Sequence, residues 1–273
     1  SKGRLYEESM ALLEEAGIKI PGGKRTLLVP ARNFPVEVLF LRDDDIPESV
    51  ASGVADVGIV GLNEVMEKRC PVGILKKLGF GKCRLSLAIP QNIDYQDRNW
   101  FSGKKIATSY PGILSDYLHK NGIVSDIHVI TGSVEIAPGI RLADAIFDIV
   151  SSGSTLVSNR LKEVETVVAV LIGTDSISPE KRGILDELLF RFDSVQAADD
   201  KKYILMNVPQ KKLNDVLSVL PGIKSPTVMP LADKEWCSVH TVLDEKCFWE
   251  IINRLKTAGA EGILVLDIEK MIL

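Results

Sequence analysis

Short apolar runs alternate with amphipathic stretches through the first part of the chain. Residues 5–16 carry apolar side chains at the spacing of one helical face, which predicts an amphipathic helix. The runs 26–30 and 36–41 are short, rich in branched residues and bounded by Gly, Pro and Asn, so we expect strands. A short helix over about 47–53 then leads into a further apolar run at 55–61. Strand, helix and strand in this order predict a parallel α/β sheet.

The same pattern restarts further along the chain. Residues 104–108, 127–130 and 145–150 predict buried strands, and 114–121 predicts a helix between the first two. Two similar α/β lobes are therefore expected. A helix over 178–192 follows, with Ser and Pro at its start, and we expect it to bridge the two halves of the chain.

From about residue 201 the pattern changes. The expected order is strand, helix, strand, strand, helix and strand, at 203–208, 211–220, 227–231, 237–243, 248–258 and 262–268. This βαββαβ order is the ferredoxin-like arrangement, a compact module that is common in the sensing of small ligands. The predicted fold class is α/β, with two lobes like those of periplasmic binding proteins and a C-terminal ferredoxin-like module.

The overall composition excludes several classes of protein. The chain has 273 residues, 45% hydrophobic and 26% charged, which is not the composition of a disordered or fibrous protein. No apolar run approaches the roughly 18–20 residues of a membrane span, so no membrane partner is expected. The net charge of −4 argues against nucleic acid as a partner. If the substrates are polyanions, local clusters of positive charge have to attract them.

The cysteines and the start of the chain indicate the compartment. Four cysteines without CxxC spacing predict reduced thiols, at Cys70, Cys83, Cys237 and Cys247. The first residues contain no apolar signal segment, so we expect a cytoplasmic protein.

The most informative stretch is the hydroxyl-rich segment after the apolar run that ends at residue 150. Residues 151–155 hold four hydroxyl side chains and one glycine. Gly153 lets the backbone turn so that successive N–H groups point inward, and the hydroxyls add donors, which makes a nest for an anion such as phosphate. Asp144 and Asp148 suit Mg²⁺ or the hydroxyls of a sugar. The alternative is a helix cap and Ser/Thr turn without a ligand, and spacing alone leaves both open.

Several segments resemble one enzyme family. Residues 148–156, with 132–135 and 142–145 before them, resemble the phosphoribosyl-pyrophosphate signature of the ATP phosphoribosyltransferase family. Further segments resemble the family in the same order along essentially the whole chain, namely 2–5, 42–47, 53–61, 83–85 and 107–111. Residues 225–227 and 268–271 resemble the regulatory domain of the family's long form.

The resemblance also predicts the domain organisation. It implies a catalytic lobe I over 1–87 and 169–198, a catalytic lobe II over 88–168, and a ferredoxin-like regulatory domain over 199–273. The family normally has an apolar strand before 2–5, so we expect an N-terminal piece to be absent here. The regions near Cys70 and over 165–170 are also a few residues short for the family.

The implied reaction transfers the 5-phosphoribosyl group from phosphoribosyl pyrophosphate to N1 of ATP, as the first step of histidine biosynthesis. Mg²⁺ is the implied cofactor, and pyrophosphate leaves. The attacking nitrogen carries no proton, so no nucleophilic side chain or general base is expected, and His119, His128 and His240 stand isolated in the sequence. Catalysis is then positioning plus electrostatic stabilisation of an oxocarbenium-like centre.

The resemblance assigns candidate residues to each ligand. The candidates for phosphoribosyl pyrophosphate are Glu135, Asp144, Asp148, Ser151, Ser152, Gly153, Ser154, Thr155 and Leu156, the last six on its 5-phosphate. The candidates for ATP are Lys2, Gly3, Arg4, Asp44, Asp56 and Tyr110. The electrostatic candidates are Arg4, Arg42 and Arg84, and the metal candidates are Asp144 and Asp148. The competing interpretations are a solvated surface charge for each cation and a packing role for Tyr110 instead of stacking on adenine.

The C-terminal module implies feedback inhibition by histidine, bound between neighbouring regulatory domains of a homo-oligomer that ranges from dimer to hexamer. The matching positions are Asn207, Ser225, Thr227 and Gly262. Two other classes of protein stay open at this point: a bilobal small-ligand binding protein, and an amino-acid sensor whose catalytic lobes are inactive. The hydroxyl-rich segment favours the enzyme, because it suits a phosphate better than a bare amino acid.

Overall fold

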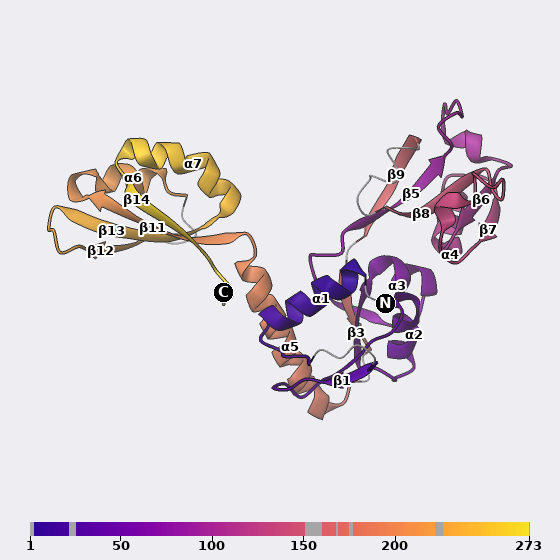
Figure 1. Ribbon diagram of the computed structural model, residues 1–273, viewed down its shortest axis with the longest axis horizontal. Helices are drawn as coiled ribbons and strands as arrows, with labels where there is room; N and C mark the ends of the chain where they lie inside the picture. Colours follow the sequence, from indigo (N-terminus) through magenta and orange to yellow (C-terminus); the bar gives the residue numbers. More distant parts are fainter. Residues whose placement is uncertain are drawn as a thin grey trace. The chain divides into compact units, whose positions relative to one another are not determined.

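The computed structural model describes residues 3–21, 26–150, 160–167, 169–174, 177–221 and 226–272 (Figure 1). The chain forms two compact units, Ser1–Glu14 with Ile18–Leu185 and Glu15–Gly17 with Asp186–Leu273. Within the described residues, the first unit contains sheets of two, three and five strands, and the second contains a sheet of four. The fold class is α/β, as predicted.

The chain begins with helix α1 (Arg4–Glu15) and the antiparallel pair β1 (Leu28–Pro30) and β2 (Glu37–Leu39). The prediction of a parallel strand–helix–strand unit over 36–61 is wrong, because β2 and the next strand, β3 (Val57–Gly61), belong to different sheets. Strand β2 instead forms a hairpin with β1, and in their short connection the N–H of Ala31 donates to the carbonyl of Val36. Such a connection permits a hairpin, whereas parallel strands need a crossover of a dozen or more residues.

The three-stranded sheet has β10 (Ala169–Gly173) at its centre, antiparallel to both β3 (Val57–Gly61) and β4 (Gly73–Lys77). Helix α2 (Ile46–Ala51), which follows the 3-10 turn Asp43–Asp45, packs on this sheet through Val50, and helix α3 (Leu62–Lys68) follows β3 directly. Gly58 permits this packing, because a Cβ there would lie 2.5 Å from Cγ2 of Ile46.

The five-stranded sheet has the order β7-β6-β8-β5-β9. Its strands are β5 (Cys83–Ile89), β6 (Lys105–Thr108), β7 (Asp126–Val129), β8 (Ala145–Val150) and β9 (Arg160–Val167). Strands β7, β6 and β8 run parallel, and β5 is antiparallel to both β8 and β9. Helix α4 (Pro111–Lys120) packs on the sheet through Leu114, next to the buried Phe147 and Ile106. Two 3-10 turns, Arg98–Phe101 and Val134–Ile136, complete this part.

The chain crosses between these two sheets twice. It leaves the three-stranded sheet after β4, enters the five-stranded sheet at β5, and returns between β9 and β10. All of β5 belongs to the five-stranded sheet, so the first crossing lies at residues 78–82.

The second unit contains the six elements in the predicted order. Helix α5 (Pro179–Ala198) leads into it, and the elements are β11 (Lys201–Pro209), α6 (Leu213–Val219, after the 3-10 turn Gln210–Lys212), β12 (Thr227–Pro230), β13 (Trp236–Asp244), α7 (Glu245–Ala258) and β14 (Glu261–Asp267). The strands form an antiparallel sheet in the order β12-β13-β11-β14.

Helices α6 and α7 cover one face of this sheet (Figure 1). Along β11 the covered side chains Ile204, Met206 and Val208 are fully buried and alternate with side chains of the other face, as the two-residue period of a strand requires. The other face carries exposed apolar side chains such as Leu264 and Leu266. We call it the open face.

No helix in the described part of the chain is both long and apolar enough to cross a membrane.

Candidate active site and effector face

Three parallel strands of the five-stranded sheet end at one edge, which we call the carboxyl edge. Strand β6 ends at Thr108, β7 at Val129 and β8 at Val150. In open α/β sheets, ligands bind at this kind of edge. The loop expected to bind the 5-phosphate begins directly after Val150, and its six candidates, Ser151, Ser152, Gly153, Ser154, Thr155 and Leu156, lie outside the described residues.

Asp148 and Glu135 are carboxylates near this edge. Asp148 lies on β8, and its Oδ1 accepts a hydrogen bond of 2.8 Å from the N–H of Ile149. The pKa of Asp148 is raised to about 6, mainly by burial and in part by the negative charge of Glu135, whereas the hydrogen bond from Ile149 lowers it. Glu135 lies in the 3-10 turn Val134–Ile136, which follows β7 and contacts β8. The structure therefore brings these two predicted residues within electrostatic reach of each other.

Asp144 lies at the other end of β8. Its Oδ2 accepts a hydrogen bond of 2.9 Å from the N–H of Lys105, and its own N–H donates to the carbonyl of Lys105. Asp148 lies four positions further along extended chain, a distance of about 13 Å. One metal ion therefore cannot contact both side chains, so at most one of these two metal candidates can be a ligand of a given ion, and both assignments stay predictions. Asp144 holds the start of β6 and β8 together.

Arg84 lies at the carboxyl edge, because β5 runs antiparallel to β8 and starts where β8 ends. The register pairs Arg84 with Val150 on one side and with Thr166 of β9 on the other. Among the predicted cations Arg84 is the one whose backbone is paired with the residue that leads into the hydroxyl-rich loop.

Tyr110 is a packing residue with a hydrogen-bonded hydroxyl. Its side chain is 8% exposed and lies in the apolar cluster of the five-stranded sheet, which supports the packing interpretation over stacking on adenine. The hydroxyl donates to Oε1 of Glu64 (3.0 Å) and accepts from Nδ2 of Asn63 (3.2 Å). Burial raises the pKa of the Glu64 carboxyl group. Burial and the negative charge of Glu64 both raise the pKa of the Tyr110 hydroxyl.

Asn63 and Glu64 belong to this buried polar network, and the sequence pattern did not indicate them. Both are buried, although they are polar residues at the start of α3. One feature of the sequence could have indicated them. Both residues directly follow the apolar strand that ends at Gly61, and residues that follow a strand lie at the edge of its sheet.

The pKa shifts show which other candidates lie near this network. The negative charge of Asp44 raises the pKa of Glu64, and the negative charge of Asp148 raises the pKa of Tyr110. Burial raises the pKa of the Cys83 thiol. The positive charge of Arg4 acts in the opposite direction and lowers this pKa. Asp44, Asp148 and Arg4 therefore all act electrostatically on groups around the start of α3 and the start of β5.

The remaining catalytic-lobe candidates form exposed ion pairs. Arg42 contacts Asp44 through Nε and Oδ1 at 3.2 Å. Asp56 contacts Nζ of Lys181 at 2.8 Å. Asp56 precedes β3, whereas α3 begins at the other end of that strand, so the structure does not bring Asp56 to the network around Glu64.

At the start of the chain, Arg4 contacts Glu8 through Nε and Oε1 at 3.0 Å in an exposed pair, and Gly3 precedes α1 with open space where a Cβ would lie. Lys2 is outside the described residues.

The effector candidates share the open face of the four-stranded sheet. Asn207 of β11 is in register with Ser238, and Thr227 of β12 is in register with His240, two positions further along β13 on the same face. A Cβ at Gly262 would lie 3.4 Å from Nδ2 of Asn207, and Gly262 has a positive φ of 55°. Ser225 is outside the described residues.

His240 is not isolated, in contrast to its interpretation from the sequence. Its Nδ1 lies 2.6 Å from the hydroxyl of Tyr203, and its Nε2 lies 2.9 Å from Oγ of Ser238. No local pattern indicates this row, because Tyr203 lies beside His240 only when β11 pairs with β13.

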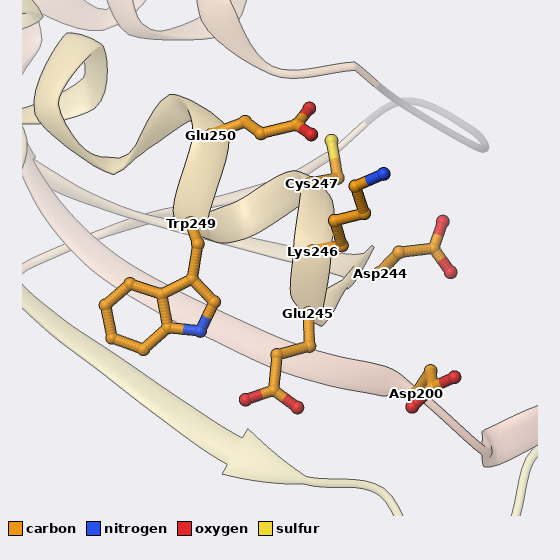
Figure 2. A pocket seen from close by; sticks show the side chains of 7 residues that line it. All are labelled: Asp200, Asp244, Glu245, Lys246, Cys247, Trp249 and Glu250. Atoms are coloured by element: carbon orange, nitrogen blue, oxygen red, sulfur yellow. The ribbon is translucent and has the colours of Figure 1, made fainter. Parts of the chain in front are cut away.

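A cavity of about 650 Å³ lies elsewhere in the second unit (Figure 2). It is lined by Asp200, Asp244, Glu245, Lys246, Cys247, Trp249 and Glu250. Asp200 precedes β11, whereas Asn207 is near the end of that strand, so this acidic cavity is remote from the effector candidates.

A second cavity, of about 590 Å³, lies beside Glu135. Glu135 lines it together with Ile146, Pro138, Gly139 and residues 88–93. In the described part of the chain, no three His, Cys, Asp or Glu side chains lie together as a ready metal cage.

Comparisons with known proteins identify the family of this chain. The family model described as ATP phosphoribosyltransferase matches residues 42–194, and the model described as HisG, C-terminal domain, matches residues 198–270. The ATP phosphoribosyltransferase of Bacteroides fragilis is 69% identical over 276 residues, which cover 100% of this chain and 98% of that protein. The one of Cytophaga hutchinsonii is 57% identical over 273 residues, which cover 99% of this chain and 96% of that protein.

A solved structure supports the same family. The ATP phosphoribosyl transferase (HisG:HisZ) complex from Thermotoga maritima has a chain that superposes with a TM-score of 0.60 at 26% identity, covering 70% of this chain and 93% of its own. Both family models, the full-length relatives and the shared fold lead to one assignment. The chain belongs to the ATP phosphoribosyltransferase family.

Proposed function

We propose that the carboxyl edge of the five-stranded sheet is the place where this chain carries out the family's reaction. The chain is an ATP phosphoribosyltransferase, which transfers the 5-phosphoribosyl group of phosphoribosyl pyrophosphate to N1 of ATP and begins histidine biosynthesis. The observation that carries the location is the placement of Asp148 and Arg84 on neighbouring strands at the end where the hydroxyl-rich loop begins, with Glu135 within electrostatic reach of Asp148.

The donor is proposed to lie along this edge. The hydroxyls and N–H groups of 151–156 suit its 5-phosphate, and Asp148 and Glu135 suit its ribose hydroxyls. Arg84 provides a positive charge for the pyrophosphate that leaves. Each of these groups stabilises charge or fixes orientation, which is the contribution that a transfer without a general base requires.

ATP is proposed to approach from the side of α1 and α3, where Arg4 and Asp44 act electrostatically on buried groups. Tyr110 then has an indirect role, because its hydroxyl holds Glu64 and Asn63 in place. Asp56 and Asp144 are left out of the proposed site on the geometry described above.

The family uses a divalent metal, and we propose Mg²⁺. Mg²⁺ is usually held by one or two carboxylates together with substrate phosphates and water. A pair such as Asp148 and Glu135 fits that requirement without a cage of three protein ligands. When bound, the ion neutralises the charge that develops on the leaving pyrophosphate.

The domain organisation is proposed as two catalytic lobes, 1–87 with 169–198 and 88–168, and a ferredoxin-like regulatory domain over 199–273. The β12-β13-β11-β14 strand order, with both helices on one face, supports the ferredoxin-like layout. The sheet membership of β5 supports a lobe boundary a few residues earlier, at 78–82.

The open face of the regulatory domain is proposed to bind histidine between two copies of the chain in a homo-oligomer, from dimer to hexamer. Asn207, Thr227 and Gly262 lie together on that face, and its exposed leucines suit contact with a second copy. The cytoplasmic location stays a prediction.

The test is product formation by the full chain. With ATP, phosphoribosyl pyrophosphate and Mg²⁺, we expect phosphoribosyl-ATP, followed by its absorbance, and pyrophosphate in equal amounts. Added histidine is expected to slow the reaction, and Asn207→Ala is expected to form product at the normal rate but to lose most of this slowing. Glu250→Gln, in the remote acidic cavity, is the matched control and should be inhibited normally. No product would contradict the activity, and normal inhibition of Asn207→Ala would contradict only the effector site.

A further inference from the structure

Helix α4 lacks a cap of its own. Its N-cap residue is Tyr110, whose side chain makes no capping hydrogen bond, and Pro111 at the next position has no N–H. The first free N–H groups of the helix are those of Gly112 and Ile113. In most helices a side chain of the N-cap residue accepts a hydrogen bond from one of these two groups.

The cap is supplied by helix α3, which follows a strand of the three-stranded sheet. Glu67 of α3 accepts hydrogen bonds from the N–H of Gly112 at Oε1 (2.8 Å) and from the N–H of Ile113 at Oε2 (2.9 Å). Both carboxylate oxygens are therefore used, and the negative charge lies at the positive end of the helix. Helix α3 directly follows a strand of the three-stranded sheet, whereas α4 packs on the five-stranded sheet.

The residue that faces the carboxylate is a glycine. A Cβ at position 112 would lie 3.0 Å from Oε1 and 3.2 Å from Oε2 of Glu67, closer than most real Cβ contacts. The backbone at Gly112 does not have a positive φ, so the close approach of Glu67 is the feature that a side chain would disturb.

We propose that Glu67 is a positioning residue that fixes how the two sheets of the first unit meet, and so aligns the groups that each contributes to the reaction. The chain joins the two sheets covalently only through the crossings near 78–82 and 168, so a contact between α3 and α4 restricts rotation about those crossings. The start of α4 directly follows the carboxyl edge, and the start of α3 carries Asn63 and Glu64. The inference rests on the proposed location of the reaction at that edge.

An ion pair in the same contact provides a matched control. Arg69, just after α3, contacts Asp116 of α4 through Nη2 and Oδ2 at 2.7 Å, but both side chains are more than half exposed. Exposed pairs of this kind contribute little. Asp116→Asn removes one negative charge from the α3–α4 contact, as Glu67→Gln does, but leaves the cap intact.

The experiment measures kcat, both KM values and Tm for the full chain and four variants. Glu67→Ala is expected to lower kcat by about tenfold or more, with both KM values within about threefold, because misalignment of bound substrates slows the chemical step. The kcat of Glu67→Gln is expected to lie between that of Glu67→Ala and that of the unchanged chain. Its amide retains one acceptor oxygen but presents an NH₂ group to the second N–H. Asp116→Asn is expected to stay within about twofold of the unchanged chain.

Gly112→Ala keeps the charge and moves only the carboxylate, so it tests the geometry. We expect kcat to fall by about threefold or more with little change in Tm. This variant decides the matter if Glu67→Ala fails to fold. The proposal is overturned if the kcat of a folded Glu67→Ala stays within about twofold of that of Asp116→Asn, or if Gly112→Ala has the kcat of the unchanged chain. Product formation by the unchanged chain is measured in the same series, so a failure of the proposed function is seen separately.

Discussion

At the scale of single residues, position along a strand separates two acidic side chains that the sequence motif does not distinguish. Asp144 and Asp148 belong to the same motif and are chemically alike, but only Asp148 lies toward the end of β8 where the hydroxyl-rich loop begins. The motif identifies both, and the register and hydrogen bonds separate them, because Asp144 is held by Lys105. The environment of Tyr110 could likewise not be predicted from the sequence. Its burial depends on α3, which the sequence pattern does not place beside it.

The raised pKa of Asp148 predicts that neutralising this side chain stabilises the folded protein, although the same change is expected to slow the reaction. Its pKa of about 6 in the folded protein lies above the ordinary aspartate value of 3.8, so ionisation above pH 6 disfavours the folded state. Asp148→Asn removes this penalty and can still accept from Ile149. We expect the variant to be more stable at pH 7.5 by about 1–2 kcal/mol, with the gain disappearing below about pH 4. Thermal unfolding at both pH values checks this, and an equal gain at both would contradict the explanation.

At the scale of elements, local patterns predicted the second unit well and the first unit less well. The six predicted elements of the second unit are all present within a few residues, because each has a clear period and its partners are near in sequence. In the first unit, the partner of β3 is β10, which follows the whole five-stranded sheet in the chain. The sequence pattern did not single out β4, β5, β9 or β10, and strands that pair over such distances carry little local signal of their partners.

Two glycines should respond oppositely to substitution. A Cβ at Gly58 would lie 2.5 Å from Ile46 and 3.1 Å from Val50, so Gly58→Ala is expected to separate α2 from the sheet and lower stability by about 1–3 kcal/mol. Gly183 lies inside α5 with open space around it, and Gly183→Ala is expected to raise stability by up to about 1 kcal/mol. Denaturant unfolding of both variants checks the pair. Similar stability of Gly58→Ala and the unchanged chain would contradict the packing described for α2.

At the scale of the whole molecule, a chain of net charge −4 acts on two polyphosphate substrates. The overall charge does not predict this, because a few locally placed groups can attract a polyanion even where the net charge of the protein is negative. The family could be recognised from motifs spread over the sequence, and the comparisons confirm it over the full chain. Which motif residues work together depended on the strand order β7-β6-β8-β5-β9, which no local pattern contains.

The most direct test of the central claim compares two asparagine substitutions on either end of one strand. Asp148→Asn and Asp144→Asn remove the same charge, and each leaves an oxygen that can accept the observed backbone hydrogen bond. If the reaction takes place at the carboxyl edge, kcat/KM for phosphoribosyl pyrophosphate should fall by about 100-fold in Asp148→Asn and stay within about threefold in Asp144→Asn. Equal losses in the two variants, or a larger loss in Asp144→Asn, would contradict the assignment of the site to this edge.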